Sequence, residues 1–240
     1  MSSIRLTAAT KLFVLTGAGI SAESGIATFR DSNGLWENHR VEDVASPEGF
    51  AKSPITVWRF YAQRRAQALT VKPNPAHAAL AGAERICGDN FMLCTQNVDN
   101  LHEAAGSNRL IHMHGELFKT RCSDDACPSL PFVDTRHEFA TLPRCGCGAL
   151  QRPHIVWFGE VPFDLHVIKR KVQACDIFMT VGSSGVVYPA AGLVREIGYR
   201  KQNGERCESV YVGLERPDNA DDFDRVVLGK AGDVLPSLFG

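Results

Sequence analysis

Short apolar runs recur along the chain, and most of them end at a glycine or a polar side chain. Such runs predict buried β-strands, and they lie at Lys11–Leu15, Asn90–Thr95, Leu110–Met113, Ile177–Val181 and Ser209–Val212. We expect the last of these to be the final strand, and a further run, Ile155–Phe158, resumes the main pattern. Apolar residues at helical spacing predict helices at Ile55–Leu69, Ala76–Ile86, Leu165–Ala174, Pro189–Tyr199 and within Phe223–Phe239.

The alternation of predicted strands and helices indicates the fold class. It is typical of an α/β fold in which helices cover both faces of a parallel sheet. Three of the strands run into short polar or glycine-rich turns, at residues 17–19, 96–100 and 182–185. Because ligands of open parallel sheets bind outside the carboxyl ends of the strands, these turns are predicted to line one site.

Composition and charge narrow the class of protein. The chain has 240 residues, of which 44% are hydrophobic and 22% are charged, and its net charge is -1. These values exclude a disordered chain, a collagen-like fibre and a coiled coil, and the charge shows no basic excess that nucleic-acid binding would favour. The apolar runs are too short to span a bilayer. The N-terminus shows no secretory signal, so we expect a cytoplasmic protein with no membrane or nucleic-acid partner.

The distribution of the eight cysteines predicts a metal site. Half of them fall within residues 119–151, a stretch rich in proline and glycine. This stretch has too few apolar residues to fold without a stabilising cross-link such as a bound metal ion or disulfides. A tight cluster in a chain without an export signal favours a structural zinc site over disulfides, although free thiols remain an alternative. The single residue between Cys145 and Cys147 is a shorter spacer than the common two-residue knuckle. The cluster consists of Cys122, Cys127, Cys145 and Cys147.

The polar residues at the predicted strand ends carry the candidate chemistry. The turn Gly17–Gly19 could bind a phosphate or could be an ordinary strand–helix turn, since its spacing departs from G-x-G-x-x-G. The turn Gln96–Asn100 could hold a polar ligand or could simply cap a helix. His112 and His114 could be a metal pair, a general base with a structural neighbour, or plain polar residues.

Several longer motifs occur together and in order along the chain. They are GAGISAESGIATFRD (17–31), TQNVDNLHEAAG (95–106), HGEL (114–117), RPHIVWFGE (152–160), GSSGVVYPAAGL (182–193) and GKAGDVLP (229–236). Together with the four cysteines they resemble the sirtuins, which are NAD-dependent protein lysine deacylases, over nearly the whole sequence. Two departures stand out: Ala27 replaces the usual proline, and Gly213–Glu215 replaces an asparagine-initiated motif.

The resemblance implies a division into domains. A Rossmann-type NAD-binding domain would comprise residues 1–35, 80–118 and 152–240. A small domain would comprise a helical insertion at 36–79 and a zinc-binding module at 119–151, in which the four cysteines hold one structural Zn²⁺.

The resemblance also implies roles for individual residues. His114 would be the general base, with Asn97 as the second catalytic residue, and His112 would support the structure. The acyl-lysine substrate would lie along Val156, Phe158, Gly159 and Glu160. Residues implied to bind NAD are Gly17, Ala18, Gly19, Ala22, Thr28, Phe29, Arg30, Trp36, Gln96, Asn97, Val98, Asp99, Gly182, Ser183, Ser184 and Ala231.

One helical pair suggests the class of acyl group. Tyr61 and Arg64 are three residues apart, share a helical face, and match the Tyr-x-x-Arg pair of sirtuins that remove succinyl and malonyl groups. A guanidinium and a phenol can bind a terminal carboxylate together. Outside the family, an exposed helix face would be the simpler explanation. The resemblance therefore implies deacylation of lysine in protein substrates, with acetyl accepted beside the acidic groups.

Three other functions compete with this interpretation. A mono-ADP-ribosyltransferase would use the same NAD site with another acceptor and is the nearest alternative. A dehydrogenase would usually need an acidic ribose-binding residue after the second strand, where this chain has Gln96 and Asn97. A non-catalytic NAD-binding module would not need His114. The oligomeric state stays open, and a monomer is compatible with the sequence.

Overall fold

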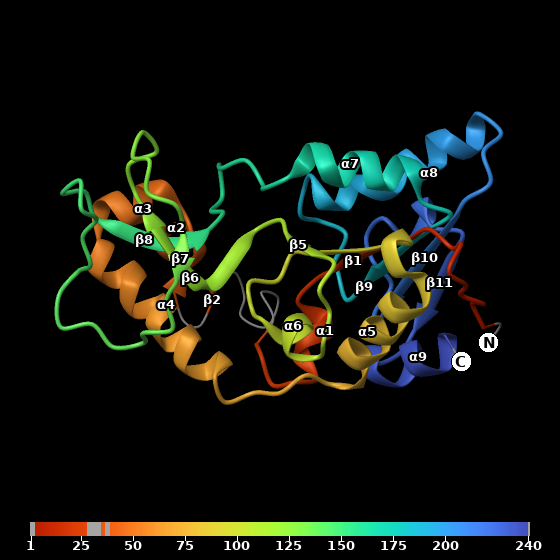
Figure 1. Ribbon diagram of the computed structural model, residues 1–240, viewed down its shortest axis with the longest axis horizontal. Helices are drawn as coiled ribbons and strands as arrows, with labels where there is room; N and C mark the ends of the chain where they lie inside the picture. Colours follow the sequence, from red (N-terminus) through yellow and green to blue (C-terminus); the bar gives the residue numbers. More distant parts are fainter. Residues whose placement is uncertain (1–2, 28–34, 37–38, 240) are drawn as a thin grey trace.

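The main sheet holds six parallel strands in the order β11-β10-β9-β1-β4-β5. The computed structural model describes residues 3–27, 35, 36 and 39–239. The sheet lies in the right-hand lobe of Figure 1. Its strands are β1 (Leu12–Thr16), β4 (Phe91–Thr95), β5 (Leu110–His112), β9 (Ile177–Val181), β10 (Glu208–Gly213) and β11 (Arg225–Leu228).

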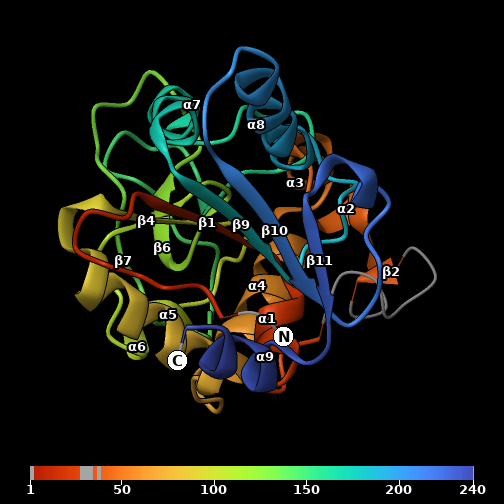
Figure 2. The ribbon, with the colours of Figure 1, turned by 90° about the vertical axis from the view of Figure 1, so that its right-hand side faces the viewer.

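Helices cover both faces of this sheet, as the sequence predicts (Figure 2). Side chains of β1 alternate between the faces: Leu12 and Val14 pack in one apolar cluster, and Phe13 and Leu15 in the other. Helices α5 (Pro75–Cys87) and α9 (Ala231–Leu238) close the first cluster, and α7 (Leu165–Ala174) and α8 (Leu193–Gln202) close the second. Every residue of β1 is buried, which explains its continuous apolar run.

A second lobe lies at the left of Figure 1 and combines helices with a small antiparallel sheet of order β7-β6-β8. Val57, Trp58 and Trp157 belong to its apolar cluster. Its helices are α2 (Val41–Val44), α3 (Pro47–Lys52) and α4 (Pro54–Ala68), and its strands are β6 (Gly115–Cys122), β7 (Phe132–Val133) and β8 (Gln151–Ile155). A two-stranded ribbon, β2 (Leu35–Trp36) with β3 (His39–Arg40), precedes α2.

Short elements fill the remaining connections. Their bounds are α1 (Gly19–Ala22), α6 (Leu101–Ala104), η1 (Gly88–Asn90), η2 (Ala190–Gly192) and η3 (Ala220–Asp222). Among the described residues, no helix is both long and apolar enough to cross a bilayer.

Two strands differ from the sequence prediction. Strand β11 follows β10, so Ser209–Val212 is not the last strand; β11 is a short edge strand in which Leu228 is exposed, and its sequence lacks a long buried run. Strand β8 ends at Ile155 and pairs with β6, so the run at 155–158 does not return to the parallel sheet. In this pairing Gly115 lies opposite Ile155, and Thr120 and Arg121 lie opposite Pro153 and Arg152.

The buried Arg65 of α4 ties this helix to the small sheet. Its guanidinium donates to the backbone oxygens of Leu117, Lys119 and Arg136 and to Thr120 Oγ1. It also lies 3.2 Å from a carboxylate oxygen of Asp134, with both side chains shielded from solvent. A buried arginine is tolerated only when its donors are satisfied in this way, so α4 has one fixed position against β6.

Candidate functional site

The carboxyl ends of β1, β4 and β9 lie side by side. Thr16 pairs with Thr95 on one side and with Val181 on the other. The next residues stay in contact: Gly17 N donates to Val181 O at 2.9 Å, and Gln96 N donates to Thr16 O at 2.9 Å. The three turns predicted to line one site therefore start at the same edge of the sheet.

The glycines of the first and third turns allow the two backbones to touch. A Cβ on Gly17 would lie 2.8 Å from Gly182 O, and a Cβ on Gly182 would lie 2.5 Å from Ile20 N. Gly182 also has a φ of +63°, which disfavours other residues. These glycines are thus required by contact between the turns themselves, whatever ligand the turns hold.

A buried hydrogen-bond network joins the first turn to the second. Asn97 Nδ2 donates to Gly17 O at 3.1 Å and to Ser21 Oγ at 3.0 Å, while Ser21 Oγ donates to Asp99 Oδ2 at 3.0 Å. Burial raises the pKa of Asp99, against the opposing hydrogen bonds from Leu101 N and Ser21. Ser21, which is not among the site residues expected from the sequence, is the shared partner of Asn97 and Asp99.

His114 is held in one tautomer. Its Nδ1 lies 3.1 Å from the backbone oxygen of Gln96, which can only accept, so Nδ1 carries the hydrogen and Nε2 keeps its lone pair. Burial lowers the pKa of His114 below the ordinary 6.5, although the bond to Gln96 acts in the opposite direction. The side chain is therefore a neutral imidazole near pH 7, as a general base must be.

His112 supports the same turn from β5. Its Nδ1 lies 3.0 Å from the backbone oxygen of Asn97, and its Nε2 lies 2.7 Å from Glu103 Oε1. The two histidines thus bind consecutive carbonyls, those of Gln96 and Asn97. The structural role expected for His112 agrees with these contacts.

The other residues implied to bind NAD either join the turns, lie on neighbouring elements, or are not described by the structure. Gln96 Nε2 donates to Ser183 Oγ at 3.1 Å, which links the second and third turns, and Ser184 O accepts from Asp218 N at 3.3 Å. Ala22 ends α1, the half-buried Val98 packs against the small-lobe core, and Ala231 begins α9. Thr28, Phe29, Arg30 and the side chain of Trp36 lie outside the described residues.

Tyr61 and Arg64 are buried within the small lobe and do not form an exposed helix face. The Tyr61 hydroxyl accepts a hydrogen bond of 3.0 Å from Trp157 Nε1, and burial raises the pKa of Tyr61 to about 12. The Arg64 guanidinium lies 5.8 Å from the centre of the Phe60 ring. The Tyr61 hydroxyl is therefore held against Trp157, on the segment implied to contact substrate, and Arg64 lies on the same helix.

That segment, residues 156–160, runs beside His114. Val156 N donates to His114 O at 2.9 Å, and Phe158 N donates to Ala45 O at 3.0 Å. Gly159 has a φ of +90°. The Glu160 carboxylate accepts from Arg152 at 2.6 and 2.9 Å and from Trp157 N at 2.7 Å. These hydrogen bonds to the Glu160 carboxylate stabilise the turn at 156–160. The Phe158 ring in this turn is exposed.

The cysteine cluster has the geometry of a metal centre. All four Sγ atoms lie within 4.8 Å of one another, with 3.6 Å between Cys122 and Cys147 and 3.7 Å between Cys127 and Cys145. A tetrahedral zinc ion with Zn–S bonds of about 2.3 Å requires sulfurs roughly 3.8 Å apart. The short spacer causes no difficulty, because Cys145 and Cys147 lie on a tight turn in which Gly148 N bonds to Cys145 O. The four residues fit one structural zinc ion.

Comparison with known proteins identifies the family of this chain. The sequence model of the Sir2 family matches residues 17–189, which span the three turns, the cysteine cluster and segment 156–160. The chain belongs to the Sir2 family. Among Sir2 relatives, the NAD-dependent protein deacylase of Pasteurella multocida is 48% identical over 236 residues, covering 96% of this chain and 97% of the relative.

Solved Sir2 structures share the fold. A Sir2 homologue in complex with NAD has a TM-score of 0.84 and 40% identity, covering 96% of this chain and 89% of its own. A Sir2 complex with a deacetylated p53 peptide and 3'-O-acetyl ADP-ribose has a TM-score of 0.79 and 28% identity, covering 94% and 90%. The Rossmann-like Sir2 fold expected from the sequence motifs is thereby confirmed.

The sequence patterns do not indicate Ser21 or Glu103 as residues of the candidate site, because one sequence does not show which distant side chains hydrogen-bond to each other. Ser21 reads as a helix-start residue, and Glu103 as part of a short helix. The available signal was a set of polar residues next to glycine-rich strand ends, positions that become buried when the strands align.

Proposed function

We propose that the protein is an NAD-dependent protein lysine deacylase that removes succinyl and malonyl groups and also accepts acetyl-lysine. The observation that carries the proposal is the neutral imidazole of His114. Its ring is held by a hydrogen bond from Nδ1 to the backbone oxygen of Gln96, the residue before Asn97. Membership of the Sir2 family and the deacylase relatives support the reaction class.

The polar strand ends fit NAD as the cosubstrate. Buried amide and carboxylate groups beside backbone turns are the usual means of orienting a polar ligand at this edge of a parallel sheet. We propose that the turn at Gly17–Gly19 and residues Ser183 and Ser184 hold the phosphates and adenosine, while Asn97 and Asp99 lie at the nicotinamide end. NAD would supply the ribose carbon to which the acyl oxygen of the modified lysine bonds as the bond from that carbon to nicotinamide breaks.

His114 would then act as the base. Its Nε2 lone pair accepts a proton from a ribose hydroxyl, which lets that oxygen attack the acyl carbon. Asn97, buried and bonded to Gly17 and Ser21, orients the reacting end without moving. Water completes the release of free lysine, and the acyl group leaves on ADP-ribose.

The pair on α4 would select acidic acyl groups. We propose that Arg64 binds the terminal carboxylate of succinyl-lysine. The Tyr61 hydroxyl already accepts from Trp157, so its own proton remains to donate to the same carboxylate. Val156, Phe158 and Gly159 would line the path of the substrate lysine.

We propose the same division of labour for the lobes. The parallel-sheet lobe would bind NAD, and the helical insertion at 36–79 with the zinc module at 119–151 would bind the acyl-lysine of protein substrates. A cytoplasmic location would suit four thiols that must stay reduced to bind zinc, and cell fractionation tests it.

An assay with NAD and acyl-peptides tests the function. Peptides carrying succinyl-, malonyl- or acetyl-lysine should each release nicotinamide together with the free-lysine peptide. Nicotinamide release that does not depend on the peptide would sink the deacylase proposal, and ADP-ribose attached to protein would favour the transferase alternative.

Arg64→Met should change the acyl preference. Removing a charged hydrogen-bond partner costs about 1.5–3 kcal/mol, so kcat/KM for succinyl-peptide should fall about 10- to 100-fold while that for acetyl-peptide changes less than about twofold. Arg59→Met, on the exposed face of the same helix, serves as the control and should leave both rates unchanged. Equal losses with both peptides in Arg64→Met would refute the carboxylate role.

A further inference from the structure

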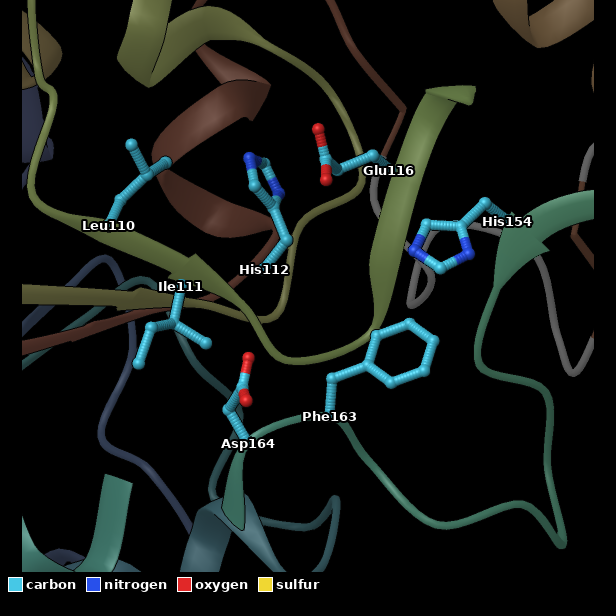
Figure 3. Close-up of a pocket in the computed structure, with 7 residues that line it drawn as sticks. All are labelled: Leu110, Ile111, His112, Glu116, His154, Phe163 and Asp164. Carbon is cyan, nitrogen blue, oxygen red and sulfur yellow. The ribbon is translucent and has the colours of Figure 1, made fainter. Parts of the chain in front are cut away.

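Three potential metal ligands gather behind the Asn97 turn, away from the cysteine cluster. The side chains of Glu103, His112 and Glu116 come from α6, β5 and β6, and each places a ligand atom within 4.8 Å of the other two. Figure 3 shows the Glu116 carboxylate directed toward the imidazole of His112 at the edge of a pocket. Separate elements thus bring one imidazole and two carboxylates to a single point.

His112 is oriented as metal-binding histidines are. Its Nδ1 must carry the hydrogen, because its partner at 3.0 Å is the carbonyl oxygen of Asn97. Nε2 therefore faces the cluster and lies 2.7 Å from Glu103 Oε1. Because a carboxylate only accepts, Nε2 also carries a hydrogen when no metal is bound, and a metal ion binding here must displace that proton. A ligating histidine commonly donates its second ring N–H to a backbone carbonyl, which fixes both tautomer and ring.

The surroundings allow an ion to enter. A pocket of about 390 Å³ adjoins the cluster and is lined by His112 and Glu116 together with His154, Phe163 and Asp164. The carboxylate of Asp164 adds negative charge to this pocket (Figure 3). Lys119 Nζ lies 2.6 Å from Glu116 Oε1 and is the positive charge that an arriving cation must compete with.

We propose that Glu103, His112 and Glu116 form a second metal site, which binds a divalent transition-metal ion. One imidazole with two carboxylates suits Zn²⁺, Ni²⁺, Co²⁺ or Mn²⁺, whereas four thiolates select zinc. The ion would bind Nε2 of His112 and the two carboxylates, and water would complete its coordination. The hydrogen bond from His112 to Asn97 O would remain.

Titration calorimetry with Ni²⁺ on the zinc-loaded protein tests this site. Wild-type protein should bind one Ni²⁺ beyond its zinc, with the zinc content unchanged. Glu103→Gln and Glu116→Gln should each weaken Ni²⁺ by about tenfold or more. Lys119→Met should strengthen it, because the competing ammonium is gone. Glu48→Gln and His166→Ala, at exposed positions elsewhere, should match wild type.

Co²⁺ absorption reports which ligands are used. At the proposed site Co²⁺ should give weak visible bands without the strong thiolate charge-transfer band that a cysteine site produces. The proposal is overturned if wild type binds no Ni²⁺ beyond its zinc, if thiolate bands appear, or if the two glutamine variants bind Ni²⁺ as wild type does. A deacylase without Ni²⁺ binding would leave the proposed function intact.

Discussion

Replacement of His114 by alanine should lower deacylation by about 10²- to 10⁴-fold, the range typical for loss of a general base. The imidazole is fixed through Nδ1 to Gln96 O, and Nε2 is the lone pair that accepts the proton. Peptide affinity should change less than about twofold, because the ring is proposed to act on the ribose and not on the acyl chain. Turnover of succinyl-peptide and calorimetry of peptide binding measure the two quantities.

The pH profile gives an independent check on the same residue. Burial lowers the pKa of His114 below 6.5, so the active neutral form persists as pH falls through 6.5, and the acid limb of kcat/KM should lie below that value. His166→Ala, an exposed histidine on α7, should keep both rate and profile. A His114→Ala enzyme that retained wild-type turnover with an unchanged acid limb would remove His114 from the mechanism.

Loss of the zinc ion should unfold the module that carries the cysteines. Leu130, Phe132 and Val133 of this module are 83%, 42% and 71% exposed, so it buries little apolar surface of its own. Structural zinc contributes about 10–16 kcal/mol of apparent binding energy in small zinc domains. We expect Cys145→Ser to lose nearly all zinc and to unfold at lower temperature.

The same variant should lose deacylase activity. Asp134 and Lys119 anchor the buried Arg65 of α4, the helix that carries Tyr61 and Arg64, so disorder in the module would release the acyl-binding helix. Zinc analysis, thermal unfolding and turnover measure the outcome. Cys207→Ser removes a thiol outside the cluster and should retain zinc and activity. Full zinc content and activity in Cys145→Ser would contradict a tetrathiolate site.

Local patterns predicted the parallel sheet well. β9 and α7 have the bounds expected from their apolar spacing, because a buried strand and an amphipathic helix each follow from a short stretch of sequence. Strand β11 was not predicted, because an edge strand needs few apolar residues. The run at β8 was expected in the parallel sheet, because the sequence alone does not show which strand pairs with it.

The site shows the same division. The sequence by itself determined the chemistry: polar turns after three strands, four clustered cysteines, and the motifs of the Sir2 family. Only the tertiary structure decided which atoms meet, such as Ser21 between Asn97 and Asp99, or Glu103 with His112 and Glu116. The reason is physical. Side-chain type and local spacing can be taken directly from the sequence, whereas contacts between residues far apart in sequence depend on strand order and packing, and so on the whole fold.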